Sequence, residues 1–253
     1  MIPIGDDNTG RTRTPYFTYL LIAANIAVFV FLQGLGTNEP FTYAFSTVPA
    51  EIVTGKDVDR PVVVQDPVTG EVAGQIDLEP TPIPVYLTLL TSMFMHGGLA
   101  HIFGNMLYLW IFGDNIEDEL GHGRYLLFYL ACGILAGLAH VATTLAFKGN
   151  PYLPALGASG AISGVLGGYM VLHPRRKVRV FFMYQIMQVP AIFAIGIWFL
   201  FQLVSGVGML GSGSQAGGVA YGAHIGGFIA GVVLIKLFAI GRRTAMVHPA
   251  MRR

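Results

Sequence analysis

The chain has 253 residues, of which 53% are hydrophobic and 11% are charged, and its formal net charge is +1 at pH 7. A soluble domain is about one-quarter charged, so this composition indicates a protein embedded in a lipid bilayer. The near-zero net charge gives no indication of the basic surface that nucleic-acid-binding proteins carry. The single cysteine, Cys132, excludes a disulfide framework and a thiolate metal cluster, and we interpret it as a packing residue.

Six apolar runs follow one another along the chain. A helix needs about 20 mainly apolar residues to cross a bilayer, and the runs predict spans over 16–33, 99–116, 124–147, 159–172, 189–207 and 219–240. The fourth run is short for a span and rich in glycine. The first run is too long for the core of a signal peptide and has no small-residue cleavage site after it. We therefore expect an all-α, polytopic bundle of six transmembrane helices.

The segments between the spans form one membrane domain, 1–253, with short tails at 1–15 and 241–253. The longest connection, 34–98, is polar. Within it, two β-prone runs flank a Pro/Gly turn and predict a hairpin over 61–78. Residues 85–95 are apolar but too few to span, which favours an interfacial or re-entrant segment.

The distribution of Lys and Arg predicts the orientation, because cytoplasmic loops carry the excess of these residues. Eleven lie on one side of the six spans: Arg11, Arg13, Arg124, Arg175, Arg176, Lys177, Arg179, Arg242, Arg243, Arg252 and Arg253. Three lie on the other side, Lys56, Arg60 and Lys148, and Lys236 is near the inner end of the last span. Both termini are therefore expected in the cytoplasm, with 34–98 as an outer loop.

This topology brings polar residues from three helices to the outer third of the membrane. Ser159 begins a span that runs inward, and His224 lies a few residues into another with the same direction. His101 and Asn105 lie just inside the second span, which also runs inward. The convergence follows from the charge count alone.

Ser159 and His224 have the chemistry of a nucleophile and its base. An imidazole that accepts the serine proton makes a weak alcohol nucleophilic and later returns the proton to the leaving amine. No Asp or Glu lies in the outer halves of the spans, so we predict a dyad without a third member. Taken singly, a serine is common at helix contacts in membranes, and a buried histidine also serves as a hydrogen bond between helices.

Glycines flank both residues. His224, Gly227 and Gly231 share one helix face, and Gly160 and Gly164 form another smooth face after Ser159. Small residues let two helix backbones approach closely, which a short Ser–His contact needs, although such contacts are general in membrane bundles.

His101 and Asn105 are i, i+4 neighbours that face the same way. Both could donate to an oxyanion together with the backbone N–H of Ser159. The alternatives are structural hydrogen bonding and a metal site of His96, His101 and His224, but a helical H-E-x-x-H signature is absent. The remaining histidines are interpreted as interface or helix-end residues: His122, His140, His173 and His248.

Three motifs together resemble the rhomboid family of intramembrane serine proteases. They are His96-Gly-Gly-Leu-Ala-His101-Ile-Phe-Gly-Asn105, Gly157-Ala158-Ser159-Gly160 and Ala223-His224-Ile225-Gly226-Gly227. Their order, spacing and placement on the spans all fit the family, from the first helix to the sixth.

The resemblance implies a six-helix bundle with Ser159 and His224 as catalytic dyad and His101, Asn105 and backbone amides as oxyanion hole. It implies no cofactor and no metal. The partners would be the lipid bilayer and transmembrane protein substrates, cut near the outer membrane face, and nucleic acid would not be one. A compact multi-pass chain of this kind fits a bacterial inner membrane.

Two departures from the family pattern stand out. Some members carry an aromatic residue four positions after the serine, stacked on the histidine, and here that position is Ser163. The outer loop also lacks the Trp-Arg pair of some bacterial members. What orients His224 is therefore open, as is the role of the 61–78 insert.

Other classes fit less well. A non-catalytic rhomboid-like chaperone or adaptor that binds transmembrane helices would be marked by loss of Ser159 or His224, and both are present. A small transporter predicts repeated halves with broken helices, and no internal symmetry is visible. A membrane metalloprotease would be sensitive to chelators.

Overall fold

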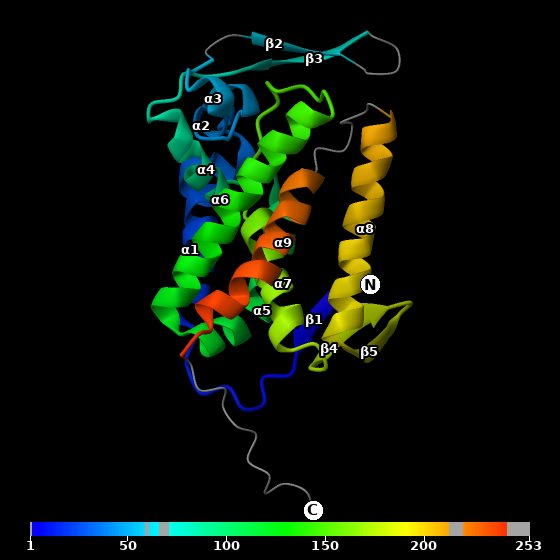
Figure 1. Cartoon of the computed structure of the whole chain (residues 1–253). Coiled ribbons are helices and arrows are strands. Elements are labelled where there is room, and N and C mark those ends of the chain that lie inside the picture. The colour runs from blue at the N-terminus through cyan, green and yellow to red at the C-terminus, as the bar shows by residue number, and fades with distance from the viewer. Residues whose placement is uncertain (1, 59–60, 66–70, 213–219, 242–253) are drawn as a thin grey trace, which may run out of the picture.

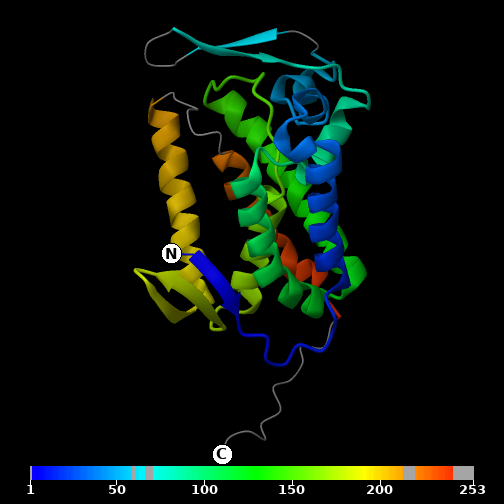
Figure 2. The same ribbon diagram turned by 180° about the vertical axis from the view of Figure 1, so that it is seen from behind.

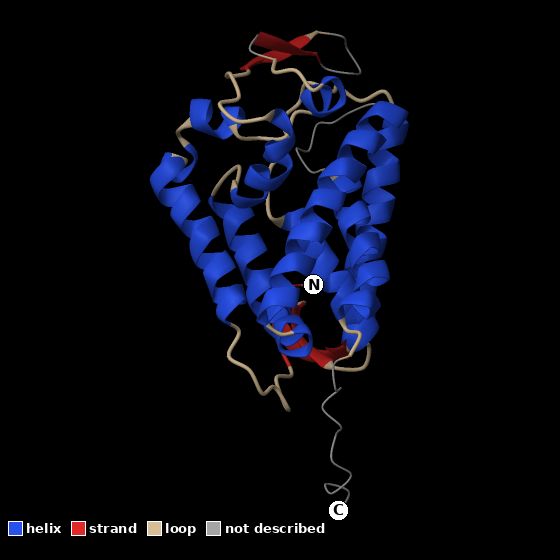
Figure 3. Cartoon of the chain, turned by 60° about the vertical axis from the view of Figure 1, so that its left-hand side comes forward, coloured by secondary structure: helices blue, strands red, loops and turns tan. Residues whose placement is uncertain are grey.

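The computed structural model describes residues 2–58, 61–65, 71–212 and 220–241. Long helices run roughly along one axis, a β-hairpin covers one end of the bundle, and a small sheet lies at the other (Figure 1, Figure 3). The helices are α1 (Tyr16–Ala27), α2 (Glu39–Ala44), α3 (Pro49–Thr54), α4 (Thr88–Thr91), α5 (Leu99–Leu120), α6 (His122–Ala146), α7 (Ser159–Leu172), α8 (Ala191–Ser212) and α9 (Tyr221–Phe238). Short helical turns lie at η1 (Val28–Leu32), η2 (Gly34–Gly36), η3 (Val85–Leu87) and η4 (Ser92–Phe94).

A helix occupies each of the six ranges predicted as spans, with α1 and η1 together forming the first. By length and hydropathy, three described helices are suited to cross a membrane, α6, α8 and α9. A fourth follows if Val85–Phe94 and Leu99–Leu120, which meet at an 81° bend, count as one span. The bend fits the expectation of an interfacial or re-entrant segment before α5. Tyr16–Leu32 and Ser159–Leu172 are apolar but shorter.

The fold is mostly helical rather than purely α as expected. The described residues form two antiparallel sheets, one of β2 (Pro61–Gln65) and β3 (Val72–Asp77), the other of β1 (Ile2–Asp6), β4 (Lys177–Phe182) and β5 (Gln185–Pro190) in the order β1-β4-β5. The first is the predicted hairpin, whose turn at 66–70 lies outside the described residues. The second was not predicted. Its first strand comes from the segment expected to be an N-terminal tail.

The small sheet and the end of α9 lie at the same end of the bundle, opposite the hairpin (Figure 2). The first and last described segments therefore lie at the same end of the bundle. Arg60 and the four basic residues within 242–253 that entered the count lie outside the described part of the chain.

Hydrogen bonds attach β1 and α1 to the C-terminal end of α5. The buried carboxylate of Glu117 accepts from the backbone N–H of Phe17 (2.9 Å) and of Thr18 (2.7 Å), two groups at the uncapped start of α1. Asp6 accepts from the Tyr169 hydroxyl (2.7 Å) and Asn115 Nδ2 (2.7 Å), and burial raises the pKa of Asp6 to about 6. The two carboxylates therefore connect β1 and α1 to α5 and α7 at this end of the bundle.

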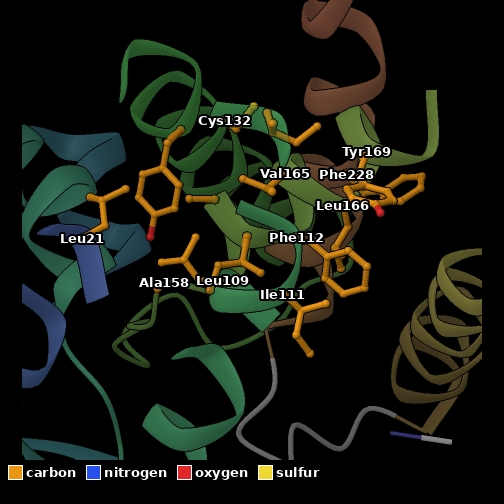
Figure 4. Packing of buried hydrophobic residues seen from close by; sticks show 14 of the residues in the cluster. Leu21, Leu109, Ile111, Phe112, Cys132, Ala158, Val165, Leu166, Tyr169 and Phe228 are labelled. Carbon is orange, nitrogen blue, oxygen red and sulfur yellow. The ribbon is translucent and has the colours of Figure 1, made fainter. Parts of the chain in front are cut away.

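The core is centred on α7, which is buried from Gly160 to Tyr169. Figure 4 shows Val165, Leu166 and Tyr169 of this helix packed among Phe112, Cys132 and Phe228. The connection 34–98 has a separate apolar cluster, in which Val62 and Leu78 of the hairpin region pack with Val48 and Ala50. Among the described residues, the hairpin therefore packs on this connection and not on the bundle core.

Glycines set the distance between α7 and α9. A Cβ added to Gly231 would lie 1.9 Å from the carbonyl oxygen of Gly164, and one added to Gly227 would lie 2.1 Å from that of Gly160. Backbone atoms cannot move aside as a flexible side chain can. The two helices are therefore in backbone contact along the faces that the sequence predicted.

We expect Gly231→Ala to destabilise the protein by about 1–3 kcal/mol, because the added methyl group must push α9 away from α7. Thermal unfolding in detergent, followed by the reaction of the buried Cys132 thiol with a maleimide dye, measures the change. Gly196→Ala in α8 is the control, since no atom lies within 4 Å of its added Cβ. Equal melting temperatures for the two variants would contradict the close-contact interpretation.

Candidate active site

Ser159 is the first residue of α7, where backbone N–H groups have no partner within the helix. The loop before it is fixed by a hydrogen bond from the Gly157 N–H to the carbonyl oxygen of Ser92 (2.8 Å). Gly157 has a φ of +127°, a conformation that L side chains rarely adopt. The turn therefore presents the serine side chain and the free end of α7 in the same direction.

His224 lies in the first turns of α9, directly opposite Ser159. Its Nε2 is 2.8 Å from Ser159 Oγ, within hydrogen-bond distance. The two residues predicted from the sequence to work together are thus in contact. The glycine-mediated approach of α7 and α9 makes the distance possible, because bulkier residues at Gly227 or Gly231 would separate the helix backbones.

The second ring nitrogen of His224 has a partner that the sequence did not predict. Gln202, on α8, places Oε1 2.7 Å from His224 Nδ1, and its side chain is buried. An amide oxygen only accepts hydrogen bonds, so this contact puts the imidazole proton on Nδ1. Nε2 is then the unprotonated nitrogen and accepts the hydrogen bond from the Ser159 hydroxyl.

The aromatic neighbours of His224 come from α8 and α9, not from the helix of the serine. The ring centroid of Trp198 lies 6.2 Å from that of His224, and that of Tyr221 lies 6.3 Å away. Ser163, at the position filled by an aromatic residue in some rhomboids, donates to the carbonyl oxygen of Ser159 instead (2.7 Å). Ser163 therefore stabilises the first turn of α7, while α8 supplies the contacts to the imidazole.

The geometry brings His101 beside Ser159. Its Nδ1 accepts a hydrogen bond from the Gly97 N–H (3.2 Å), which leaves the proton of the neutral ring on Nε2. A Cβ added to Gly157 would lie 3.0 Å from this Nε2 and 3.6 Å from Ser159 Oγ. The missing side chain at Gly157 thus leaves room for His101 to direct an N–H group towards the serine.

Asn105 lies one turn further along the same face of α5. It is buried, and its Nδ2 has no hydrogen-bond partner among the described residues. A buried donor without a partner costs about 1–3 kcal/mol. Such a group is suited to a ligand oxygen that is absent from the resting protein.

A cavity of about 40 Å³ lies beside Ser159, which is enough for a water molecule. His140 of α6 is one of its lining residues, together with Ser92 and Ser159. His140, predicted to be an interface or helix-end residue, therefore lies where α6 borders the cavity next to the serine. A larger cavity, about 290 Å³, is apolar and lies away from Ser159, between α5 and α8.

The alternative metal set does not form in the described residues, where no three His, Cys, Asp or Glu side chains are arranged to hold a metal ion. The rings of His96 and His101 are neighbours, with centroids 5.1 Å apart. His96 is held through its backbone, which donates to Gln33 Oε1 (2.9 Å) and accepts from Gln33 Nε2 (3.1 Å).

The chain is similar to proteins from bacteria and mitochondria. It is 34% identical over 166 residues to "Rhomboid protease GluP" of Bacillus subtilis, covering 64% of this chain and 26% of that protein. It is 32% identical over 151 residues to "Rhomboid protein 1, mitochondrial" of Saccharomyces cerevisiae, covering 58% of this chain and 40% of that protein. The human "Presenilin-associated rhomboid-like protein, mitochondrial" is 33% identical over 95 residues, 38% of this chain and 24% of that protein.

In each of these matches, the similar region is less than half of the relative's length. The relatives belong to different membranes, so the bacterial inner membrane expected from the sequence gains no support from them. The rhomboid domain family matches residues 85–240, from the start of η3 to just beyond α9, and the match includes Ser159, His224, His101 and Asn105. The chain belongs to the rhomboid family and is a multi-pass integral membrane protein.

Proposed function

We propose that this protein is an intramembrane serine endopeptidase that uses Ser159 and His224. The observation that carries the proposal is the 2.8 Å contact between Ser159 Oγ and His224 Nε2, formed by residues from two helices. A serine that needs only a structural hydrogen bond can make it within its own helix, as Ser163 does. The contact across the helices, beside two candidate oxyanion donors, is the arrangement that acyl transfer requires.

The reaction runs through an acyl-enzyme. Ser159 Oγ attacks the peptide carbonyl carbon while its proton moves to His224 Nε2, and the carbonyl becomes an oxyanion. His101 Nε2–H, Asn105 Nδ2 and the Ser159 N–H stabilise that oxyanion. The protonated imidazole then gives its proton to the leaving amine as the C–N bond breaks. Water, deprotonated by His224, hydrolyses the remaining ester and frees Ser159.

The substrate class follows from the position of the site. In the six-span topology with both termini in the cytoplasm, Ser159 and His224 lie in the outer third of the membrane. A peptide bond at that depth belongs to a transmembrane protein near its outer boundary. Such a segment must unwind locally, because the backbone hydrogen bonds of a helix shield its carbonyl groups.

The substrate reaches the site laterally, by displacement of α8. Large apolar side chains along α8 are exposed, among them Phe193, Leu200, Phe201, Val204 and Val207. The 290 Å³ cavity separates part of α8 from α5, so little packing is lost when the two move apart. Residues 208–212 of the Gly/Ser-rich stretch 208–218 belong to α8, and the rest of the stretch lies outside the described part of the chain.

The proposal predicts that a fluorophosphonate probe labels the purified protein in detergent, because activated serines react with it. Ser159→Ala and His224→Ala should each abolish labelling, and cleavage of a model single-pass substrate should fall below detection. Ser163→Ala is the matched serine control and should be labelled. A folded wild-type protein that is neither labelled nor active would favour the non-catalytic, helix-binding adaptor, and loss of activity with a chelator would favour a metalloprotease.

Asn105→Ala should lower kcat by about 100–1000-fold with little change in KM, since an oxyanion donor acts mainly in the transition state. Steady-state cleavage of the single-pass substrate measures both constants. Asn25→Ala is the control, because Asn25 is also a buried asparagine but donates to the carbonyl oxygen of Leu21 within α1 (2.7 Å). An Asn105→Ala enzyme with wild-type kcat would remove Asn105 from the oxyanion hole.

A covalent link between α5 and α8 should block cleavage of the single-pass substrate and leave probe labelling unchanged. Phe112 and Ile195 line the cavity between the two helices, and cysteines there, in a Cys132→Ala background, can be joined by a short bifunctional reagent. The same variant without the reagent is the control. Full cleavage by the linked protein would show that the substrate arrives by another route.

A further inference from the structure

α8 meets α9 through one face, on which Trp198, Gln202 and Gly206 recur at a spacing of four residues. Next to them, the ring of Phe199 stacks on that of Phe228 with centroids 4.0 Å apart. Gln202 is the polar side chain on this face, in the run Phe199-Leu-Phe-Gln202-Leu-Val, and it is 7% exposed. An uncharged amide placed there without a partner would cost free energy in an apolar environment.

The partner of that amide is the imidazole of His224. The 2.7 Å contact from Gln202 Oε1 to Nδ1 and the 2.8 Å contact from Ser159 Oγ to Nε2 use both ring nitrogens. The ring is therefore fixed in orientation and in tautomer by two hydrogen bonds from two different helices. In a Ser–His pair with a carboxylate, the carboxylate performs the same two tasks, holding the ring and selecting the tautomer.

We propose that Gln202 is a positioning residue for the reaction, which holds His224 as the Nδ1–H tautomer and makes the base competent only while α8 is packed against α9. This inference rests on the proposed function, because it assigns a role within the same site. In this inference, Gln202 orients His224 in place of the aromatic residue that some rhomboids carry at the position of Ser163.

The position of Gln202 on α8 links substrate access to chemistry. If α8 moves aside to admit a transmembrane segment, Gln202 moves with it and His224 loses its acceptor at Nδ1. The ring is then free to take the other tautomer, in which Nε2 carries the proton and cannot accept the one from Ser159. α8 must therefore return to α9 before Ser159 attacks, and a segment that holds α8 open is bound but not cut.

The test compares the full-length protein in detergent with Gln202→Leu, Gln202→Glu and Phe199→Leu. Gln202→Leu removes the acceptor and should lower kcat by about 10–100-fold, the usual effect of losing a group that orients a functional histidine, with KM changed less than about twofold. The rate of fluorophosphonate labelling should fall by the same factor, since the small probe does not need α8 to open. Gln202→Glu keeps an acceptor oxygen and should recover most of the rate.

Phe199→Leu separates positioning from packing. It weakens the contact between α8 and α9 without touching the amide, so its labelling rate should stay near that of the wild type. The tautomer of His224 can be measured by spectroscopy of protein labelled with ¹⁵N-histidine. The His224 signal is the one that disappears in His224→Ala, and in the wild type it should show a protonated Nδ1. In Gln202→Leu that signal should shift towards a mixture of the two tautomers.

Three results would overturn the inference. They are an equal loss of labelling in Phe199→Leu and Gln202→Leu, a Gln202→Leu effect confined to KM, and a protonated Nε2 in the wild type. A wild-type protein that is not labelled at all would overturn the proposed function and the inference with it. A labelled wild type with an insensitive Gln202→Leu would overturn the inference alone.

Discussion

The site depends on the backbone contact between α7 and α9. With Gly231 on the carbonyl oxygen of Gly164 and Gly227 on that of Gly160, the helix axes are as close as backbone atoms allow. Only at this separation can a side chain as short as serine reach an imidazole on the neighbouring helix. The same contact buries most of α7, so the helix that carries Ser159 is held on every side by the core. A side chain at the start of such a buried helix is positioned by the core packing and not by a loop.

The burial of α7 contrasts with the exposure of α8, and the contrast suits the helices to different tasks. α5, α7 and α9 carry Ser159, His224, His101 and Asn105. α8, bordered by an apolar cavity and largely exposed, is the helix that the proposed lateral entry of a substrate would displace. Its single buried amide nonetheless reaches the base. The least tightly packed helix therefore controls the orientation of a group on the most tightly packed pair.

The sequence predicted the parts of this site that follow from local patterns. Apolar runs located the helices, and the glycine spacing around Ser159 and His224 predicted the close faces, because both are properties of neighbouring residues. Gln202 was missed because its partner is 22 residues away across a loop, and an amide in an apolar run does not indicate its contact. β1 was missed for a similar reason: it pairs with β4, so that Ile2 lies opposite Phe181, whereas β2 and β3 adjoin the same turn. The role of His140 as a cavity wall depended on how α6 is rotated about its axis.

The proposed base, His224, could be oriented either by a charged carboxylate or by a neutral amide. A carboxylate behind His224 would orient it firmly, but a charge at this depth costs several kcal/mol unless it is paired. An amide gives the directional contact without the charge, and its weaker hydrogen bond can be broken and remade when α8 moves. A neutral acceptor therefore suits a histidine at this depth, and the proposed opening of α8 would break only this hydrogen bond to the imidazole. The absence of a carboxylate then reflects the solvent around the site and does not leave the histidine without support.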